Sequence, residues 1–538
     1  MAAPCGNQGP ARAAFRPGTH PEGRARLSSL VKSAARPVLT TETRLGPGEV
    51  VGTGSQAAYR AVGELAGEPH ALRTELAGSD EPVQPRKTIA SLAHLTDLHV
   101  TDVQSPARFE WVNRYGQDPR FRELITMQRP QETLNAHATA AMLRTINNLD
   151  TVRLAVMTGD AIDNTQRNEL TNFLALLDGG MVRPDSGAPG YDGVQRADWP
   201  GEIYWKPDGL PRGDLFQSAL GFPQHPGLLE EAMQPFRSEG IRVPWLGCYG
   251  NHEEVCQGVG IVSEVLARAM TGSRKAIEPP TGLDPEGVVE LFVQHPEQFL
   301  AGASVEVAAD PERRPISRAE FVDAHVRKGG HGFTTDAYYV HDEGAVRYIT
   351  LDTVCDAGGA DGSIDAAQLR WLERRLEEVH SSFQTRDGSN ARTRNADRYV
   401  VILSHHGYDT LSNPRAESRA DALLNLLLRF RNVVLWLNGH IHANRITPRS
   451  TSGGGRHGFW EVTTSSLVDW PCQARLIELF QADGGKLGIA CTMLDHDGEG
   501  LAGLHRELAG NVPVRGFDSG YSGTPLDRNA ILVLPQPF

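Results

Sequence analysis

Eight side chains that can bind metal ions or transfer protons stand in five short clusters along the middle of the chain. In chain order they are Asp97, His99, Asp160, Asn251, His252, His405, His440 and His442. A mixed set of carboxylate, imidazole and amide ligands suits manganese, iron or zinc, whereas oxygen ligands alone suit magnesium or calcium. The composition of the clusters therefore predicts a transition-metal site.

The spacing within two clusters lets neighbouring residues reach the same ion. Asp97 and His99 are two positions apart in a predicted loop, and so are His440 and His442. Asp160 has two carboxylate oxygens, so it could bridge two ions. These spacings favour a site that is assembled from several loops.

Single polar residues outside this pattern have simpler interpretations. A lone Asp after a strand usually caps a helix or closes a turn, and we expect this of Asp102, Asp163 and Asp352. Asp163 is at most a residue that supports a metal ligand from behind. The fourth cluster contains two adjacent histidines, so either His405 or His406 could be the ligand there.

Each cluster follows a short aliphatic or β-branched run, which is typical of a strand that ends in a functional loop. The runs cover residues 89–95, 152–157, 243–248, 399–403 and 433–437. Helical periodicity recurs between strands. It covers residues 131–149, 366–380 and 419–430. This alternation indicates an α/β protein, in which loops after the strands converge on one crevice.

The five clusters, in this order, resemble the motifs of the calcineurin-like metallophosphoesterase superfamily: D-x-H, G-D, G-N-H-D/E, H and G-H-x-H. The most specific matches are Gly250-Asn251-His252-Glu253 and Gly439-His440-Ile441-His442. The long gaps between motifs look like those of a bacterial subgroup with long inserts. The resemblance implies a four-layer αββα sandwich, in which helices flank two mixed β-sheets and the metal site lies at one edge.

The resemblance also implies a role for each matched residue. One metal would be held by Asp97, His99 and His442, a second by Asn251, His405 and His440, and Asp160 would bridge them. The family motif begins with the ligand, which favours His405 over His406. A hydroxide between the metals would attack phosphorus, and His252 would stabilise the phosphoryl oxygens or protonate the leaving group.

The activity implied is that of a dinuclear metal-dependent phosphoesterase. Its substrate would be a small-molecule phosphodiester or phosphomonoester, with the diester favoured. A nuclease is an alternative, but the net charge of −13 argues against a nucleic-acid partner. A second alternative is a catalytically silent metal-binding module. A motif without one of its ligands or without His252 would favour it, but all of these residues are present.

Composition shifts along the chain suggest its organisation. We expect a partly disordered N-terminal arm over residues 1–87, a metallophosphoesterase domain over 88–500 and a C-terminal extension over 501–538. Stretches rich in proline, glycine and charge at about 178–240 and 256–335 are predicted inserts that roof the site.

Cysteines and targeting signals bear on the compartment. The six cysteines lack C-x-x-C spacing, so we expect mostly reduced thiols, with a local Cys248–Cys256 bridge as the alternative. No apolar run approaches the roughly 20 residues that span a bilayer. Residues 1–36 lack the apolar stretch of a secretory signal. We therefore expect a cytoplasmic protein without a membrane span. Export is known among related proteins but has no signal here, and the oligomeric state is left open.

Overall fold

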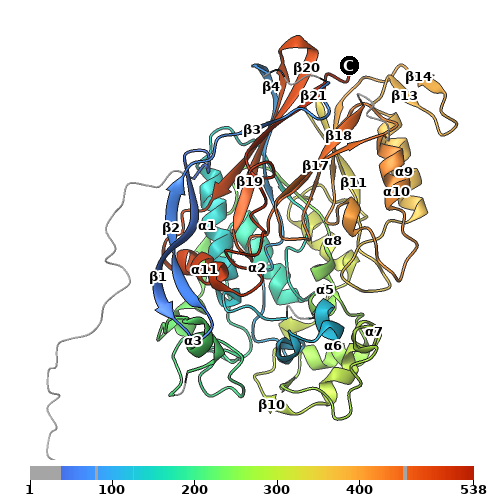
Figure 1. Cartoon of the computed structure of the whole chain (residues 1–538). Helices are drawn as coiled ribbons and strands as arrows, with labels where there is room; N and C mark the ends of the chain where they lie inside the picture. Colours follow the sequence, from blue (N-terminus) through green and yellow to red (C-terminus); the bar gives the residue numbers. More distant parts are fainter. Residues whose placement is uncertain (1–37, 79–80, 82, 125–126, 212, 452–456) are drawn as a thin grey trace, which may run out of the picture. The chain divides into compact units, whose positions relative to one another are not determined.

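Two mixed β-sheets form the centre of the fold (Figure 1). The structure is a computed structural model, and it describes residues 38–78, 81, 83–124, 127–211, 213–451 and 457–538. The first sheet has the strand order β3-β21-β20-β19-β4-β5-β8, and the second has the order β11-β12-β15-β16-β18-β17.

The strands of the first sheet are β3 (Ala71–Arg73), β4 (Pro85–Leu95), β5 (Leu154–Met157), β8 (Trp245–Gly247), β19 (Gln473–Ala482), β20 (Lys486–Asp495) and β21 (Ala530–Pro535). Those of the second are β11 (Tyr339–Glu343), β12 (Val346–Thr350), β15 (Tyr399–Leu403), β16 (Val433–Asn438), β17 (Arg445–Ser450) and β18 (Gly458–Thr463). The hairpins β11-β12 and β19-β20 stand where turn residues between two apolar runs favour them.

Parallel strands run through the middle of both sheets. In the first sheet β4, β5 and β8 are parallel neighbours, and in the second β12, β15, β16 and β18 are. Every residue of β5 is apolar and buried, as expected for a strand that is covered on both faces. Because the strands are parallel, the loops that follow them leave each sheet at one edge.

Side chains of the second sheet alternate between two hydrophobic cores. Val401 and Leu403 pack in a core shared with the first sheet, whereas Val400 and Ile402 pack beneath helices on the other face. This follows from the two-residue period of a strand. The flanking helices are α1 (Asn135–Asn147) and α2 (Arg167–Asp178) on one side and α9 (Ala366–Glu377) and α10 (Ala420–Leu427) on the other (Figure 1). The predicted α/β fold is therefore confirmed.

Both ends of the described chain join the first sheet. β21 pairs with β20, and β3 pairs with β21, although the sequence places β3 in an arm and β21 in an extension. β1 (Thr43–Thr53) and β2 (Ala58–Ala66) form a hairpin of their own. Pairing between such distant segments leaves no local signal in either of them. The division of the chain at residues 88 and 500 stays a prediction.

Much of the predicted insert at about 256–335 shares a hydrophobic core with the segment after β4. Phe292 and Phe299 pack against Phe109 and Trp111, which lie in the segment after β4. The insert contains α6 (Glu264–Met270), α7 (Val288–Gln294) and α8 (Arg318–Arg327). Its predicted position over the site stays a prediction.

The five cysteines that the structure describes are buried free thiols, so no Cys248–Cys256 bridge forms. Cys5 lies outside the described residues, as does the rest of segment 1–37. Within the described ranges, no helix has both the length and the apolar character needed to cross a membrane.

Candidate metal centre

The five predicted clusters follow strands that end at one place in the fold. Asp97, Asp160 and Asn251 come after β4, β5 and β8 of the first sheet. His405 and His440 come after β15 and β16 of the second. Packing of the two sheets brings these loops together, although some of their residues are 343 positions apart in the chain.

One group of donor atoms surrounds His442. Its Nε2 atom lies 3.3 Å from Asp97 Oδ1 and 3.3 Å from His99 Nε2. Asp160 Oδ2 lies 3.8 Å from His99 Nε2. One ligand atom from each of these four buried residues lies within 4.8 Å of the others, so the group could hold a metal ion.

A second group surrounds the side-chain oxygen of Asn251. Asn251 Oδ1 lies 2.9 Å from His405 Nε2 and 3.1 Å from His440 Nδ1. His405 Nε2 is in turn 3.2 Å from Asp160 Oδ2. The Asp160 carboxylate therefore faces both groups, which is where a bridging ligand has to lie. Its bridging role stays a prediction.

The structure separates the two adjacent histidines of the fourth cluster. His405 Nδ1 lies 2.8 Å from the carbonyl oxygen of Thr158, so its Nε2 faces Asp160 and Asn251. His406 Nδ1 lies 2.9 Å from Thr353 Oγ1, and its Nε2 lies 2.9 Å from the carbonyl oxygen of Ala360. Protein partners thus occupy both nitrogens of His406, and this geometry favours His405 as the ligand.

The backbone at these clusters is unusual. Asp97, His99, Asp160, His440 and His442 all have a left-handed conformation, with φ between 46° and 70°. For residues other than glycine such conformations cost on the order of 1–3 kcal/mol each, and they persist where the surroundings enforce them. Their concentration at one place is typical of a functional site.

Two glycines of the motifs are required by close packing. A Cβ atom on Gly439 would lie 1.9 Å from Thr96 Oγ1 and 2.5 Å from Asp97 Oδ2. A Cβ atom on Gly159 would lie 2.6 Å from His405 Nδ1. Any larger residue would therefore push the proposed ligands apart.

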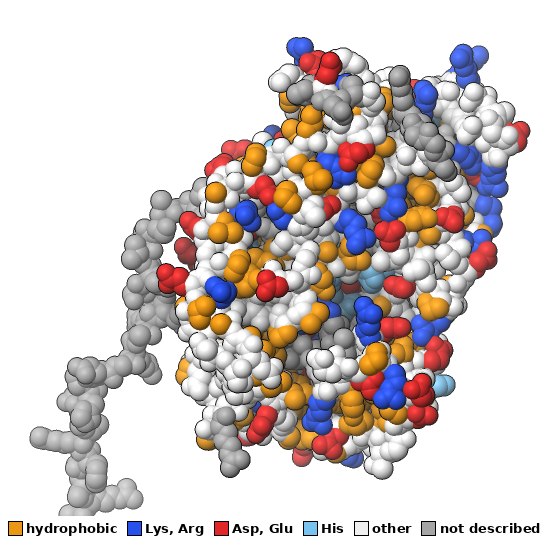
Figure 2. All heavy atoms as spheres, viewed as in Figure 1, with side chains coloured by type: hydrophobic (Ala, Val, Ile, Leu, Met, Phe, Trp, Pro, Cys, Tyr) orange, Lys and Arg blue, Asp and Glu red, His pale blue; other side chains and the backbone are white. Residues whose placement is uncertain are grey.

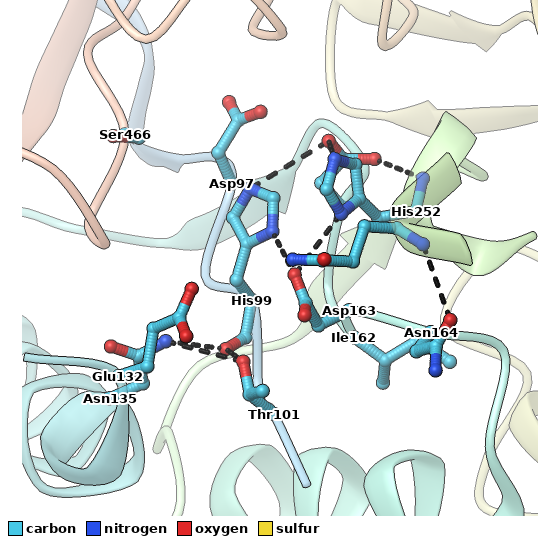
Figure 3. A network of polar contacts seen from close by, with 12 residues as sticks. Asp97, His99, Thr101, Glu132, Asn135, Ile162, Asp163, Asn164, His252 and Ser466 are labelled. Carbon is cyan, nitrogen blue, oxygen red and sulfur yellow. Dashed lines mark hydrogen bonds and ion pairs between the residues drawn. The ribbon is translucent and has the colours of Figure 1, made fainter. Parts of the chain in front are cut away.

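Two carboxylates hold proposed ligands from behind, and the sequence allows this role for one of them, Asp163. Asp163 Oδ1 lies 2.9 Å from His99 Nδ1 and 3.1 Å from His252 Nδ1, and Figure 3 shows its carboxylate directed at both rings. Asp469 Oδ2 lies 2.6 Å from His442 Nδ1. A carboxylate on Nδ1 keeps the proton there and leaves Nε2 free for a metal. Of the two roles considered for Asp163, this geometry favours support of a ligand over a simple cap or turn.

The loop of Asp160 is held by a buried glutamate. Glu253 accepts hydrogen bonds from the backbone N–H groups of Asp160, Ala161 and Ile162, at 3.1, 2.7 and 3.1 Å. Its identity matches the last position of the third motif, so this residue could have been found from the sequence. It orients the proposed bridging residue without contacting the other donors described above.

The cluster is open to solvent on the side of two histidines. The side chains of His252 and His440 are 16% and 14% exposed, whereas those of Asp97 and His99 are fully buried. Histidine atoms are visible at the bottom of a hollow on the face shown in Figure 2. A small molecule can therefore approach the cluster from this side.

Nearby carboxylates change the protonation of two imidazoles. Burial by itself lowers the pKa of His405, but the charges of Asp160 and Asp97 outweigh burial and raise it to about 9. Burial also acts to lower the pKa of His442, and Asp97 and Asp469 outweigh it and raise the pKa. In the metal-free protein, protons on these imidazoles compensate the negative charge that cations would otherwise compensate.

We expect the metal-free protein to lose stability as the pH rises from 6.5 to about 9. The folded protein raises the pKa of His405 above its unfolded value. Its protonated form therefore stabilises the fold fully below pH 6.5, and this is lost as the pH rises through about 9. Over this range the free energy of unfolding should fall by about 3 kcal/mol, because each unit of pKa shift corresponds to roughly 1.4 kcal/mol. Chemical denaturation of chelator-treated protein measures it.

Two variants test the assignment of this pH dependence. His405→Asn should make the decline shallower and leave the part that is due to His442. His406→Asn should keep the whole decline, because burial holds the pKa of His406 well below 6.5. The same slope in both variants would contradict the assignment to His405.

The sequence matches no protein-family model and no curated protein. Among solved structures, the chain is similar to a dimetal phosphatase from Danio rerio, with 11% identity, coverage of 75% of this chain and 96% of that chain, and a TM-score of 0.33.

Two further solved structures are similar to this chain. One is GAP50, the anchor in the inner membrane complex of Plasmodium, with 12% identity, 76% and 85% coverage and a TM-score of 0.29. The other is the sulfate thiohydrolase SoxB of Thermus thermophilus in complex with glycerol, with 14% identity, 79% and 61% coverage and a TM-score of 0.25. At such TM-scores these likenesses establish neither the family nor the activity of this chain.

Proposed function

We propose that this protein is a phosphoesterase that binds two divalent transition-metal ions and hydrolyses a phosphate ester of a small molecule, with diesters favoured over monoesters. One ion would be held by Asp97, His99 and His442, the other by Asn251, His405 and His440, with Asp160 shared. The observation that carries the proposal is the position of Asp160, which lies 3.8 Å from His99 in one group and 3.2 Å from His405 in the other.

The donor set fits manganese, iron or zinc because it mixes carboxylate, imidazole and amide ligands. When bound, such cations polarise a phosphoryl oxygen and acidify a water molecule. The protein's own residues supply the rest. Asp163 and Asp469 hold the Nδ1 atoms of two ligands, and the burial of the cluster excludes competing water from most of it.

His252 supports a catalytic role over the silent metal-binding module. It belongs to neither ligand set, yet Asp163 holds its Nδ1 while its Nε2 lies 3.9 Å from Asp160 Oδ2 on the open side of the cluster. A partly exposed imidazole in this position can give a proton to a leaving oxygen. The nuclease alternative is disfavoured by the net charge of −13, which opposes a polyanionic substrate.

We expect metal-stripped protein to be inactive and to regain turnover of an aryl phosphodiester when Mn²⁺, Fe²⁺ or Zn²⁺ is added singly. Rates with the matching monoester and with single-stranded DNA, measured in parallel, separate the candidate substrates. Diester turnover above monoester turnover supports the proposed preference. Faster cleavage of DNA would favour a nuclease. Two bound metals by elemental analysis without turnover of any substrate would favour the silent module.

A further inference from the structure

A continuous row of buried charges joins the back of His99 to the back of His442. It starts at Asp163, which contacts His99 Nδ1, and ends at Asp469, which contacts His442 Nδ1. Between these carboxylates lie Arg108, Glu132 and Arg129. All three are at most 3% exposed, so solvent does not screen the row.

The contacts along the row are close. Arg108 forms an ion pair with Asp163 through Nη1, and its Nη2 lies 2.6 Å from Glu132 Oε2. The other oxygen of Glu132 lies 3.2 Å from Arg129 Nη1. Arg129 Nε lies 2.8 Å from Asp469 Oδ1. Glu132 is therefore the central residue, because each of its oxygens binds one of the two guanidinium groups.

The charges of the row and its neighbours compensate one another. Lys275 Nζ lies 2.6 Å from Glu110, which is 3.6 Å from Arg108, and Arg515 Nη1 lies 2.7 Å from Asp469. Four carboxylates thus face four cations. The carboxylates are those of Glu110, Glu132, Asp163 and Asp469, and the cations are Arg108, Arg129, Lys275 and Arg515. Buried ion pairs contribute little net stability over apolar packing, so stability alone does not explain this arrangement.

The two groups of proposed ligands differ in what holds them. The row supports His99 and His442, which belong to one group. In the other group, His405 is held by the carbonyl oxygen of Thr158, and the Nδ1 of His440 faces Asn251. None of the contacts along the row reaches this second group.

We propose that Arg108, Glu132 and Arg129 are positioning residues that couple His99 to His442 and thereby set the affinity of one of the two metal sites. The inference rests on the proposed function, because it requires a metal pair. The segment between β4 and α1 supplies all three residues, so the role of this segment is to fix the orientation of two imidazoles that come from different sheets.

Glu132→Gln tests this inference with little change of shape. The glutamine side chain has one oxygen, which can accept from one guanidinium group, and its NH₂ group cannot accept from the other. One of the two arginines therefore loses its contact, and with it the alignment of Asp163 and Asp469 is lost. Loss of such outer contacts typically lowers metal affinity by about 10–100-fold. We expect one site to weaken by about this factor and the other to stay near its wild-type affinity.

Asp102→Asn is the matched control. Asp102 Oδ2 lies 3.0 Å from Arg313 Nε, both side chains are as buried as those of the row, and Asp102 contacts none of the proposed ligands. The change is again from carboxylate to amide beside an arginine. We expect both variants to lower the unfolding midpoint of the metal-free protein by similar amounts, which accounts for the merely structural effect.

The readout is metal stoichiometry, by elemental analysis after dialysis against limiting Mn²⁺, together with calorimetric titration. Wild type and Asp102→Asn should bind two ions, and Glu132→Gln should bind one under the same conditions. Two ions in Glu132→Gln at wild-type affinity would overturn the inference and leave the proposed function intact. No metal in wild type would instead overturn the proposed function.

Arg129→Lys serves if Glu132→Gln does not fold. It retains the charge but loses the fork that binds Glu132 and Asp469 at once. We expect the same site to weaken by a smaller factor. Unchanged affinity at both sites in this variant would overturn the inference.

Discussion

Asp160→Asn should bind at most one metal ion and lose nearly all phosphoesterase activity. Its Oδ2 atom lies 3.2 Å from His405 and 3.8 Å from His99, so both groups of ligands share this one carboxylate. An amide lacks the second anionic oxygen and presents an NH₂ group instead. Loss of several kcal/mol of transition-state stabilisation lowers the rate on the order of a thousandfold.

Elemental analysis and turnover of an aryl phosphodiester measure these two effects together. Asp102→Asn is again the matched control, because it makes the same change at a buried carboxylate that pairs with Arg313 and contacts none of the proposed ligands. It should retain both ions and most of the turnover. Two tightly bound ions in Asp160→Asn would contradict the proposed shared role of Asp160.

His252→Ala should retain both metal ions and lose most turnover. The imidazole is held by Asp163 at 3.1 Å and is 16% exposed, so it can reach a substrate without holding a metal. A positioned general acid typically contributes about 10²–10⁴-fold to the rate. We expect a loss in this range for an ester whose leaving group is a poor one.

Two esters distinguish the two roles considered for His252. If it protonates the leaving oxygen, His252→Ala should lose far more turnover of an alkyl ester than of a nitrophenyl ester, because nitrophenolate departs without a proton. If it stabilises the phosphoryl oxygens, both esters should lose about equally. His341→Ala, which changes a partly exposed histidine of β11, is the control and should behave like wild type. Wild-type activity of His252→Ala towards both esters would exclude either role.

Local patterns account for the parts of the fold that the sequence predicts well. The apolar runs before the clusters at Asp97, Asp160 and His405 correspond to β4, β5 and β15, because a strand buried on both faces needs consecutive apolar residues. These signals all lie within a few residues of the elements that they predict.

Long-range contacts explain what the sequence did not predict. β3 and β21 lie at opposite ends of the chain and pair only because the strands between them form a sheet. Arg129 and Asp469 are 340 positions apart, and neither belongs to a motif. The partners of a buried charge depend on which loops meet, and that is decided by packing.

By itself, the sequence determined which side chains are available for chemistry and that each of them follows a strand, because both properties are local. Only the tertiary structure decided that His405 rather than His406 faces Asp160, and that Asp163 and Asp469 hold the imidazoles from behind. The physical reason is that a hydrogen-bond partner is selected by distance and direction. For these residues both depend on how the two sheets pack against each other, one built from both ends of the chain and the other from residues 339–463.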